Sequence, residues 1–197
     1  MMQLQPPPML PPEQINQIIE LLERYKGAMP FADEELARHR ALRVALDDQF
    51  QRGEAALSAW RAAIARRWEC EVNGQRIYSA IRRQICDYFG KDGAYTLLVA
   101  PTHPEQASTA SDLLAEMRRL EVSLELLRPR PPFADESIAR LHASVDDLAT
   151  AIEWTEHCET DRRSVLIEQR MACNLYQRAC DKTRRLIESH MGVHQND

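Results

Sequence analysis

The phrase PFADEELAR, at residues 30–38, returns 102 residues later as PFADESIAR, at residues 132–140. The same offset holds without a gap between residues 31–90 and residues 133–192, and sixteen of the sixty aligned positions are identical. Composition alone would give roughly four identities, taking ordinary residue frequencies. An internal duplication explains the match, so we treat the chain as two copies of one unit.

Each copy of the phrase predicts the start of a helix. Acidic residues follow the Pro-Phe-Ala start, at Asp33 and Glu34 in the first copy and at Asp135 and Glu136 in the second. There they oppose the positive end of the helix dipole. The preceding Phe can pack against the next apolar turn as a hydrophobic staple. We therefore interpret the phrase as a helix start signal rather than as a binding motif.

Apolar spacing predicts three helices in each copy. The first helix is clearest in the second copy, where a capping box at residues 109–112 marks its start. Its apolar residues are spaced four, three and four apart, at Leu113, Met117, Leu120 and Leu124. The corresponding helix of the first copy is expected to begin after Pro12 and to end at Gly27 and Pro30.

The second helix carries a heptad seam in the second copy, formed by Ile138, Leu141, Val145, Leu148 and Ile152. The first copy has His39 and Arg43 at the intermediate seam positions. Its seam is therefore expected to be wetter, or to be rotated toward Leu42.

A third helix is expected after Gly53 in the first copy, with Gly74 as another possible break. Gly90 and Gly192 are expected to follow the C-termini of the two third helices. No Gly or Pro marks a turn between the second and third helices of the second copy, so one continuous helix remains an alternative there.

The predicted fold is all-α: a tandem duplication of a three-helix unit that forms one elongated antiparallel helical bundle or two similar bundles. The apolar patch at residues 95–100 is too short for a sheet and is expected to cross the bundle as a strap. The expected organisation is a disordered Pro-rich arm at 1–12, helical repeat one at 13–90, a linker at 91–110, helical repeat two at 111–192 and a disordered tail at 193–197.

Composition disfavours several classes of protein. The net charge is −5, and neither half of the chain has the basic excess of a nucleic-acid-binding protein. No apolar run approaches the roughly 20 residues that span a bilayer, and the N-terminus lacks the pattern of a secretory signal. A cytoplasmic location is therefore expected. The five cysteines, an odd number with no C-x-x-C pair, are expected to be reduced thiols.

The sequence offers no catalytic motif. It contains no G-x-S-x-G, no H-E-x-x-H, no Gly-rich phosphate loop and no dinucleotide fingerprint. Glu153 and His157 have the spacing to share a metal ion, but the aligned positions of the first copy hold Gln51 and Ala55. We expect a protein that is not an enzyme and that uses no metal and no cofactor.

Arginine gives the strongest remaining signal. Arginine pairs bidentately with carboxylates and phosphates, and several arginines recur at the same offset in both copies. A cleft between the copies could gather them with aromatic residues around a ligand. The candidate ligand-binding residues are Arg76, Arg178, Arg83, Arg185, Tyr78, Tyr176 and Trp68. The alternative is that the arginines form ion pairs with acidic residues of neighbouring helices.

Two functions from different classes are consistent with this pattern. The leading one is a non-enzymatic helical interaction protein, a scaffold or chaperone-like bundle that acts through protein–protein contacts. Its partner would be another protein, or a second copy of the chain in a homodimer. The alternative is a binding module for a small anionic or apolar ligand in a cleft between the two repeats.

Overall fold

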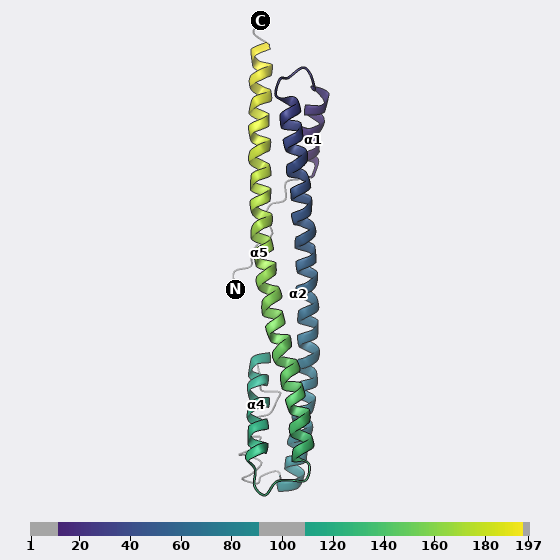
Figure 1. Cartoon of the computed structure of the whole chain (residues 1–197), viewed down its shortest axis with the longest axis vertical. Helices are drawn as coiled ribbons and strands as arrows, with labels where there is room; N and C mark the ends of the chain where they lie inside the picture. Colours follow the sequence, from purple (N-terminus) through teal and green to yellow (C-terminus); the bar gives the residue numbers. More distant parts are fainter. Residues whose placement is uncertain (1–11, 91–108, 195–197) are drawn as a thin grey trace. The chain divides into compact units, whose positions relative to one another are not determined.

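The computed structural model describes residues 12–90 and 109–194, and helices account for most of them (Figure 1). They are α1 (Pro12–Arg24), α2 (Ala32–Phe89), α4 (Ala110–Leu126) and α5 (Ala134–His194). The all-α class is therefore confirmed. Residues 1–11 of the Pro-rich arm, the patch at 95–100 and residues 195–197 of the expected tail lie outside the described residues. Pro12, which was assigned to the arm, is the first residue of α1.

The helix ends follow the local signals in the sequence. α2 begins at Ala32 and α5 at Ala134, directly after the phenylalanines of the repeated phrase. The Thr109 side chain caps α4, because its Oγ1 accepts a hydrogen bond from the backbone N–H of Asp112 at 3.1 Å. Gly90 follows α2 with a φ of 86°, a conformation that favours glycine.

The number of helices in each repeat differs from the prediction. The expected second and third helices form one continuous helix in both repeats, because α2 runs through Gly53 and Gly74 and α5 is unbroken from Ala134 to His194. In repeat two this continuity was the stated alternative. The predicted helix end at Gly192 and the predicted tail from residue 193 are wrong, because α5 continues to His194. A Cβ at position 53 would lie 3.5 Å from the Gln169 side chain, and one at position 74 would lie 2.9 Å from Met117 Sδ. Gly74 therefore permits close packing between helices, whereas position 53 has room for a methyl group. An isolated glycine costs a helix only about 1 kcal/mol, so it does not by itself end one.

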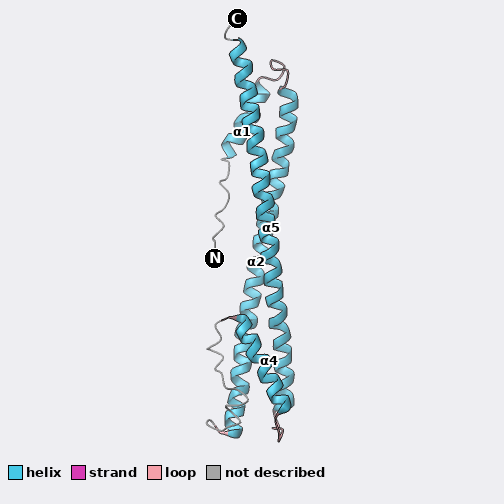
Figure 2. Ribbon diagram, turned by 90° about the vertical axis from the view of Figure 1, so that its left-hand side faces the viewer, coloured by secondary structure: helices cyan, strands magenta, loops and turns pink. Residues whose placement is uncertain are grey.

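The chain folds into two compact units, each built from three helical segments. Unit 1 contains the described residues up to Leu57 and from Asp161 onward, and unit 2 contains those of Ser58–Thr160. In unit 1, α1 lies beside the first part of α2 and the last part of α5. In unit 2, α4 lies beside the last part of α2 and the first part of α5 (Figures 1 and 2). Each unit thus combines the first part of one predicted repeat with the last part of the other.

The core of unit 1 lies where its three segments meet. Glu35 contacts Lys182 whereas Arg52 contacts Glu168, so α2 and α5 run antiparallel here. His39 is fully buried in this core and Leu42 packs against it, so the seam of the first copy contains a polar side chain that is closed to solvent. The buried apolar residues are Ile18, Leu22, Met29, Ala32, Leu36, Leu46, Cys173, Tyr176, Cys180 and Ile187.

The main core cluster of unit 2 is apolar and contains the predicted heptad seam, and Ser137, Ser144 and Thr155 are buried in the same unit. Leu141, Val145 and Leu148 are buried, and Ile138 and Ile152 pack against them. The other buried residues of this cluster are Cys70, Tyr78, Ile81, Ile85, Leu113, Met117, Leu120, Leu124, Leu127 and Ala151.

Candidate functional site

The structure divides the predicted ligand-binding residues between the two units. Unit 2 holds Arg76, Arg83, Tyr78 and Trp68, and unit 1 holds Arg178, Arg185 and Tyr176. Both tyrosines are buried in hydrophobic cores, whereas Trp68 is 64% exposed and the four arginines are exposed. A ligand-binding role for this set of residues remains a prediction.

The aligned arginines of the two units differ in their hydrogen bonding. Arg76 donates a hydrogen bond to Asn73 Oδ1 at 2.8 Å, and Arg83 Nε donates to the Ser79 carbonyl at 3.4 Å. Arg178 and Arg185 have no ion-pair partner among the described residues. They border a hollow of about 370 Å³ on the surface of α5. Arg178 and Arg185 thus differ from Arg76 and Arg83, whose guanidinium groups bond within their own helix.

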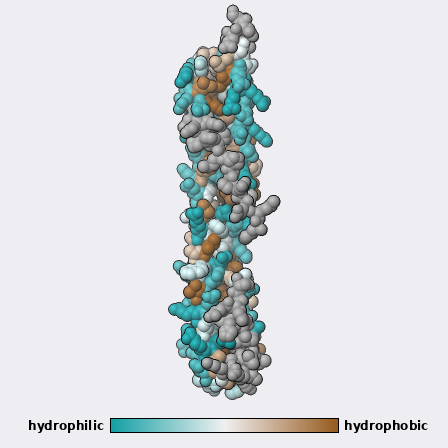
Figure 3. Space-filling model, turned by 180° about the vertical axis from the view of Figure 1, so that it is seen from behind, coloured by the Kyte–Doolittle hydropathy of each residue, from teal (hydrophilic) through white to brown (hydrophobic). Residues whose placement is uncertain are grey.

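Apolar side chains reach the surface of both units. On the face that Figure 3 shows, apolar patches stand between polar ones. The densest set on one helix lies on α5 in unit 1, where Ile167, Met171 and Leu175 are 56–60% exposed. The sequence-based prediction did not include these three residues. Their regular four-residue spacing was the signal that could have revealed them.

The exposed apolar residues continue into basic ones along α5. We define the α5 stripe as Ile167, Met171, Leu175, Arg178, Lys182 and Arg185. At about 100° per residue, these six positions fall within about 80° of the helix circumference. The core residues of the same segment, such as Tyr176 and Cys180, lie on roughly the opposite side. This part of α5 therefore has two apolar faces, of which one is buried in unit 1.

Two of the acidic residues beside the α5 stripe are already engaged, whereas Glu188, three residues after Arg185, is exposed and has no ion-pair partner among the described residues. Glu168 pairs with Arg52 at 3.1 Å, and Asp181 pairs with Arg184 at 3.3 Å. These pairs leave the stripe with a local excess of positive charge on a chain whose net charge is −5.

A polar cluster lies beneath the basic part of the stripe. Thr183 Oγ1 donates a hydrogen bond to Glu35 Oε2 at 3.0 Å and lies 2.8 Å from His39 Nε2. Lys182 Nζ donates to Glu35 Oε1 at 3.1 Å. Because the threonine hydroxyl donates its proton to the carboxylate, His39 Nε2 carries the proton that it shares with Thr183. His39 Nδ1 is buried and has no hydrogen-bond partner.

The cluster shifts the titration of its two ionisable members. Burial alone would raise the pKa of Glu35, but hydrogen bonds from Lys182 and Thr183 outweigh it and hold the pKa below its usual value. Burial lowers the pKa of His39, against the opposing effect of the Glu35 carboxylate. At neutral pH the cluster therefore holds an ionised carboxylate and a neutral imidazole.

Tyr176 packs beside this cluster. Its ring meets the His39 ring edge-on, with a centroid distance of 5.6 Å. Burial, with a contribution from Cys180, raises the pKa of Tyr176 to about 12, so the phenol stays neutral. Its buried hydroxyl has no hydrogen-bond partner. Tyr176 thus acts as a core residue of unit 1.

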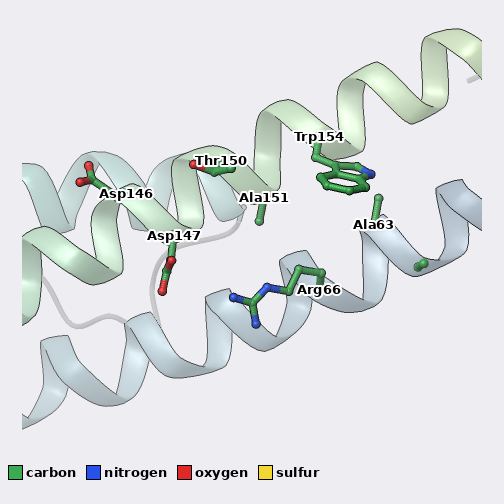
Figure 4. A pocket seen from close by; sticks show the side chains of 8 residues that line it. Ala63, Arg66, Asp146, Asp147, Thr150, Ala151 and Trp154 are labelled. Atoms are coloured by element: carbon green, nitrogen blue, oxygen red, sulfur yellow. The ribbon is translucent and has the colours of Figure 1, made fainter.

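Unit 2 contains a cavity of about 460 Å³ between α2 and α5 (Figure 4). Trp154 and Ala151 on α5 face Ala63 on α2, and these three residues supply its apolar surface. Arg66 and Asp147 bring both signs of charge to its edge. The cavity has room for a small molecule, and none of the seven predicted ligand-binding residues lines it.

The part of the chain that the structure describes contains no group of three or more His, Cys, Asp or Glu side chains that could hold a metal ion. None of its helices has the length and apolar character needed to cross a bilayer. The chain matches no protein-family model, no curated protein and no solved structure.

Proposed function

We propose that this chain is a non-enzymatic helical interaction protein, a scaffold or chaperone-like bundle that acts through protein–protein contacts. The observation that carries the proposal is the exposure of Ile167, Met171 and Leu175 at four-residue intervals on α5. A helix that is apolar on two faces gains stability when both faces are covered. Unit 1 covers one of them, and a partner helix would cover the other.

The energetics favour a helical partner. Complete burial of one large apolar side chain is worth roughly 1.5–3 kcal/mol. Three such side chains in line offer a partner a continuous apolar ridge, and an amphipathic helix engages such a ridge through residues three and four apart. Single exposed apolar residues, such as Val44, are ordinary on protein surfaces and offer no such ridge.

Native mass spectrometry of the protein purified from its own host tests this function. We expect the wild-type chain to carry a protein partner, and Met171→Asp to lose it. Val44→Asp is the matched control, because Val44 is 70% exposed in the same unit and has Arg40 and Asp48 four residues away on either side. A wild-type chain that carries no protein, or a partner that survives Met171→Asp, would contradict the proposal.

A small-ligand module is the second candidate, and the cavity of unit 2 is the observation that favours it. An apolar ligand seated there would change the fluorescence of Trp154. The same mass spectra would show a bound mass of a few hundred daltons, lost in Ala151→Trp, which fills the cavity, and retained in Met171→Asp.

We also propose that the two repeats arose by duplication. Aligned positions share burial: Leu22 and Leu124 are both 0% exposed, and Leu46 and Leu148 are 4% and 0% exposed. A duplicated gene would give two units with similar cores, after which the surface of one could diverge to bind a partner. Self-association as a homodimer remains a prediction.

A further inference from the structure

We propose that the α5 stripe binds an acidic amphipathic helix of another protein. The apolar residues of that helix would pack on Ile167, Met171 and Leu175, and its carboxylates would pair with Arg178 and Arg185. This inference rests on the proposed function and names the chemical class of the partner.

The stripe has the dimensions of a helix-binding surface. From Ile167 to Arg185 it spans 18 residue steps, or about 27 Å at 1.5 Å per residue. A partner helix of about five turns would cover it. Arg178 and Arg185 lie two turns apart, so acidic residues seven apart on one face of the partner would reach both guanidinium groups.

The positive charge of the α5 stripe predicts that the partner helix is negatively charged. Glu168 and Asp181 beside the stripe are paired with arginines of this chain, and Lys182 is paired with Glu35. Arg178 and Arg185 are exposed and have no ion-pair partner among the described residues. Carboxylates are the protein groups that match the planar donors of arginine.

The aligned positions of α2 in unit 2 differ from the α5 stripe. Ala65, Glu69 and Asn73 stand where α5 has its three apolar residues. The aligned arginines, Arg76 and Arg83, form hydrogen bonds within their own helix. The chain therefore provides an internal comparison: the same arginines, bonded within their own helix, beside two exposed apolar residues, Trp68 and Val72, instead of the three on α5.

A second copy of the chain fits the stripe less well. In a parallel pairing of two stripes, the arginines of one copy would lie against those of the other. In an antiparallel pairing, the basic part of each stripe would lie against the apolar part of its mate. Neither arrangement brings opposite charges together, and a symmetric dimer interface must be self-complementary.

Two designed peptides test the proposal by fluorescence anisotropy. Both are helices of about 20 residues with leucines at four-residue intervals in one half. One carries glutamates seven apart on the same face of the other half, and its twin carries lysines there. We expect the full-length chain to bind the acidic peptide roughly tenfold or more tightly than the lysine peptide at low salt. Added salt should reduce this preference.

Substitutions locate the binding. Arg178→Glu/Arg185→Glu should reverse the preference between the peptides, and Arg178→Gln/Arg185→Gln should remove it. The matched control Arg76→Glu/Arg83→Glu should leave the preference unchanged. Met171→Asp should weaken the binding of both peptides. All these side chains are exposed, so circular dichroism should show unchanged helix content in each variant.

Three outcomes would overturn the proposal. Equal binding of both peptides would reject the acidic partner, while the proposed function would stand if native mass spectra still showed a protein lost in Met171→Asp. An equal effect of the control substitutions in α2 would reject the α5 stripe as the site. If neither peptide binds, and if the chain forms a dimer that Met171→Asp dissociates, the stripe would instead be the interface with a second copy of the chain.

Discussion

His39 is the residue that most clearly distinguishes the two cores. It is 0% exposed, and the aligned position of the second repeat holds Leu141, which is also 0% exposed. A buried imidazole needs partners for both ring nitrogens, and only Nε2 has one, at Thr183. Unit 1 therefore contains a titratable group at the place where unit 2 contains a hydrocarbon.

This difference predicts that unit 1 loses stability in mild acid. Burial lowers the pKa of His39 in the folded protein, so below its ordinary value of 6.5 the unfolded state binds more protons than the folded state. The free energy of unfolding should therefore fall as the pH drops from about 6.5 toward about 5. Around His39, Arg38 acts in the same direction and Glu35 opposes it.

Urea unfolding of His39→Leu provides the check. This variant introduces the residue of the second repeat, and we expect it to flatten the pH dependence above about pH 5. Glu35 has a lowered pKa, so its own contribution is lost only as the pH falls below its ordinary value of 4.5. An unchanged slope in His39→Leu would show that another group titrates in this range.

Glu35 should stabilise unit 1 more than Ser137 stabilises unit 2. Glu35 bonds to both Lys182 and Thr183, whereas Ser137, at the aligned position, donates one hydrogen bond to Gln84 at 3.2 Å. Glu35→Ala should cost about 1–3 kcal/mol because it leaves buried polar groups unsatisfied. Ser137→Ala should cost about 1 kcal/mol or less. If urea unfolding shows that Glu35→Ala and Ser137→Ala lose equal free energy of unfolding, the cluster around Glu35 adds no more stability than one hydrogen bond.

At the scale of the helix, the two glycines inside α2 differ in their surroundings. Replacing a helical glycine by alanine gains about 1 kcal/mol from helix propensity. At Gly53 the new methyl group would meet Gln169 at an ordinary contact distance of 3.5 Å. At Gly74 it would lie only 2.9 Å from the Sδ atom of Met117, which is fully buried.

We therefore expect opposite results from the two substitutions. Gly53→Ala should raise the free energy of unfolding by about 0.5–1 kcal/mol. Gly74→Ala should gain less, or should destabilise, because Met117 must move within a packed core. The two variants are matched controls, because each replaces a glycine of α2 by alanine. Thermal unfolding, followed by circular dichroism, measures the change in stability of each. A larger gain at Gly74 would show that Met117 relaxes at no cost.

At the scale of the whole molecule, neither predicted repeat contains a complete core. The core of unit 1 takes Leu22 and Leu36 from repeat one and Tyr176 and Ile187 from repeat two. The core of unit 2 draws in the same way on α2, α4 and α5. A fragment of either repeat would thus expose apolar surface that the full chain buries.

Fragments 13–90 and 111–192 provide a test of this arrangement. At low concentration each fragment alone should have little helix and should unfold without a cooperative transition, because isolated helices are marginal in water. An equimolar mixture should regain helix signal and a cooperative transition. A monomeric fragment that unfolds cooperatively on its own would contradict this expectation.

Local features of the helices were predictable because they depend on neighbours three or four residues apart. The starts of α2 and α5, the Thr109 cap and the heptad seam through Leu141 and Leu148 are of this kind. Gly53 and Gly74 were misjudged as breaks, because a glycine inside a helix has the same local sequence signal as one that ends a helix.

The candidate surface was predictable only in part. The repeated arginines drew attention to Arg178 and Arg185. The sequence did not show that these two form no ion pair with the residues that the structure describes, whereas Arg76 and Arg83 bond to their own helix. Whether an arginine finds a partner depends on side chains that the fold brings near it.

The sequence by itself determined the helical class, the helix starts and the apolar positions of each helix, because backbone hydrogen bonds, caps and periodicity are local. Only the tertiary structure decided that each core joins parts of both repeats, and which apolar face of α5 is buried. Tyr176 and Leu175 are adjacent in the sequence, and both are apolar enough for a core. Packing against α2 buries Tyr176 beside His39 and leaves Leu175 exposed, because the fit between surfaces more than a hundred residues apart selects the face.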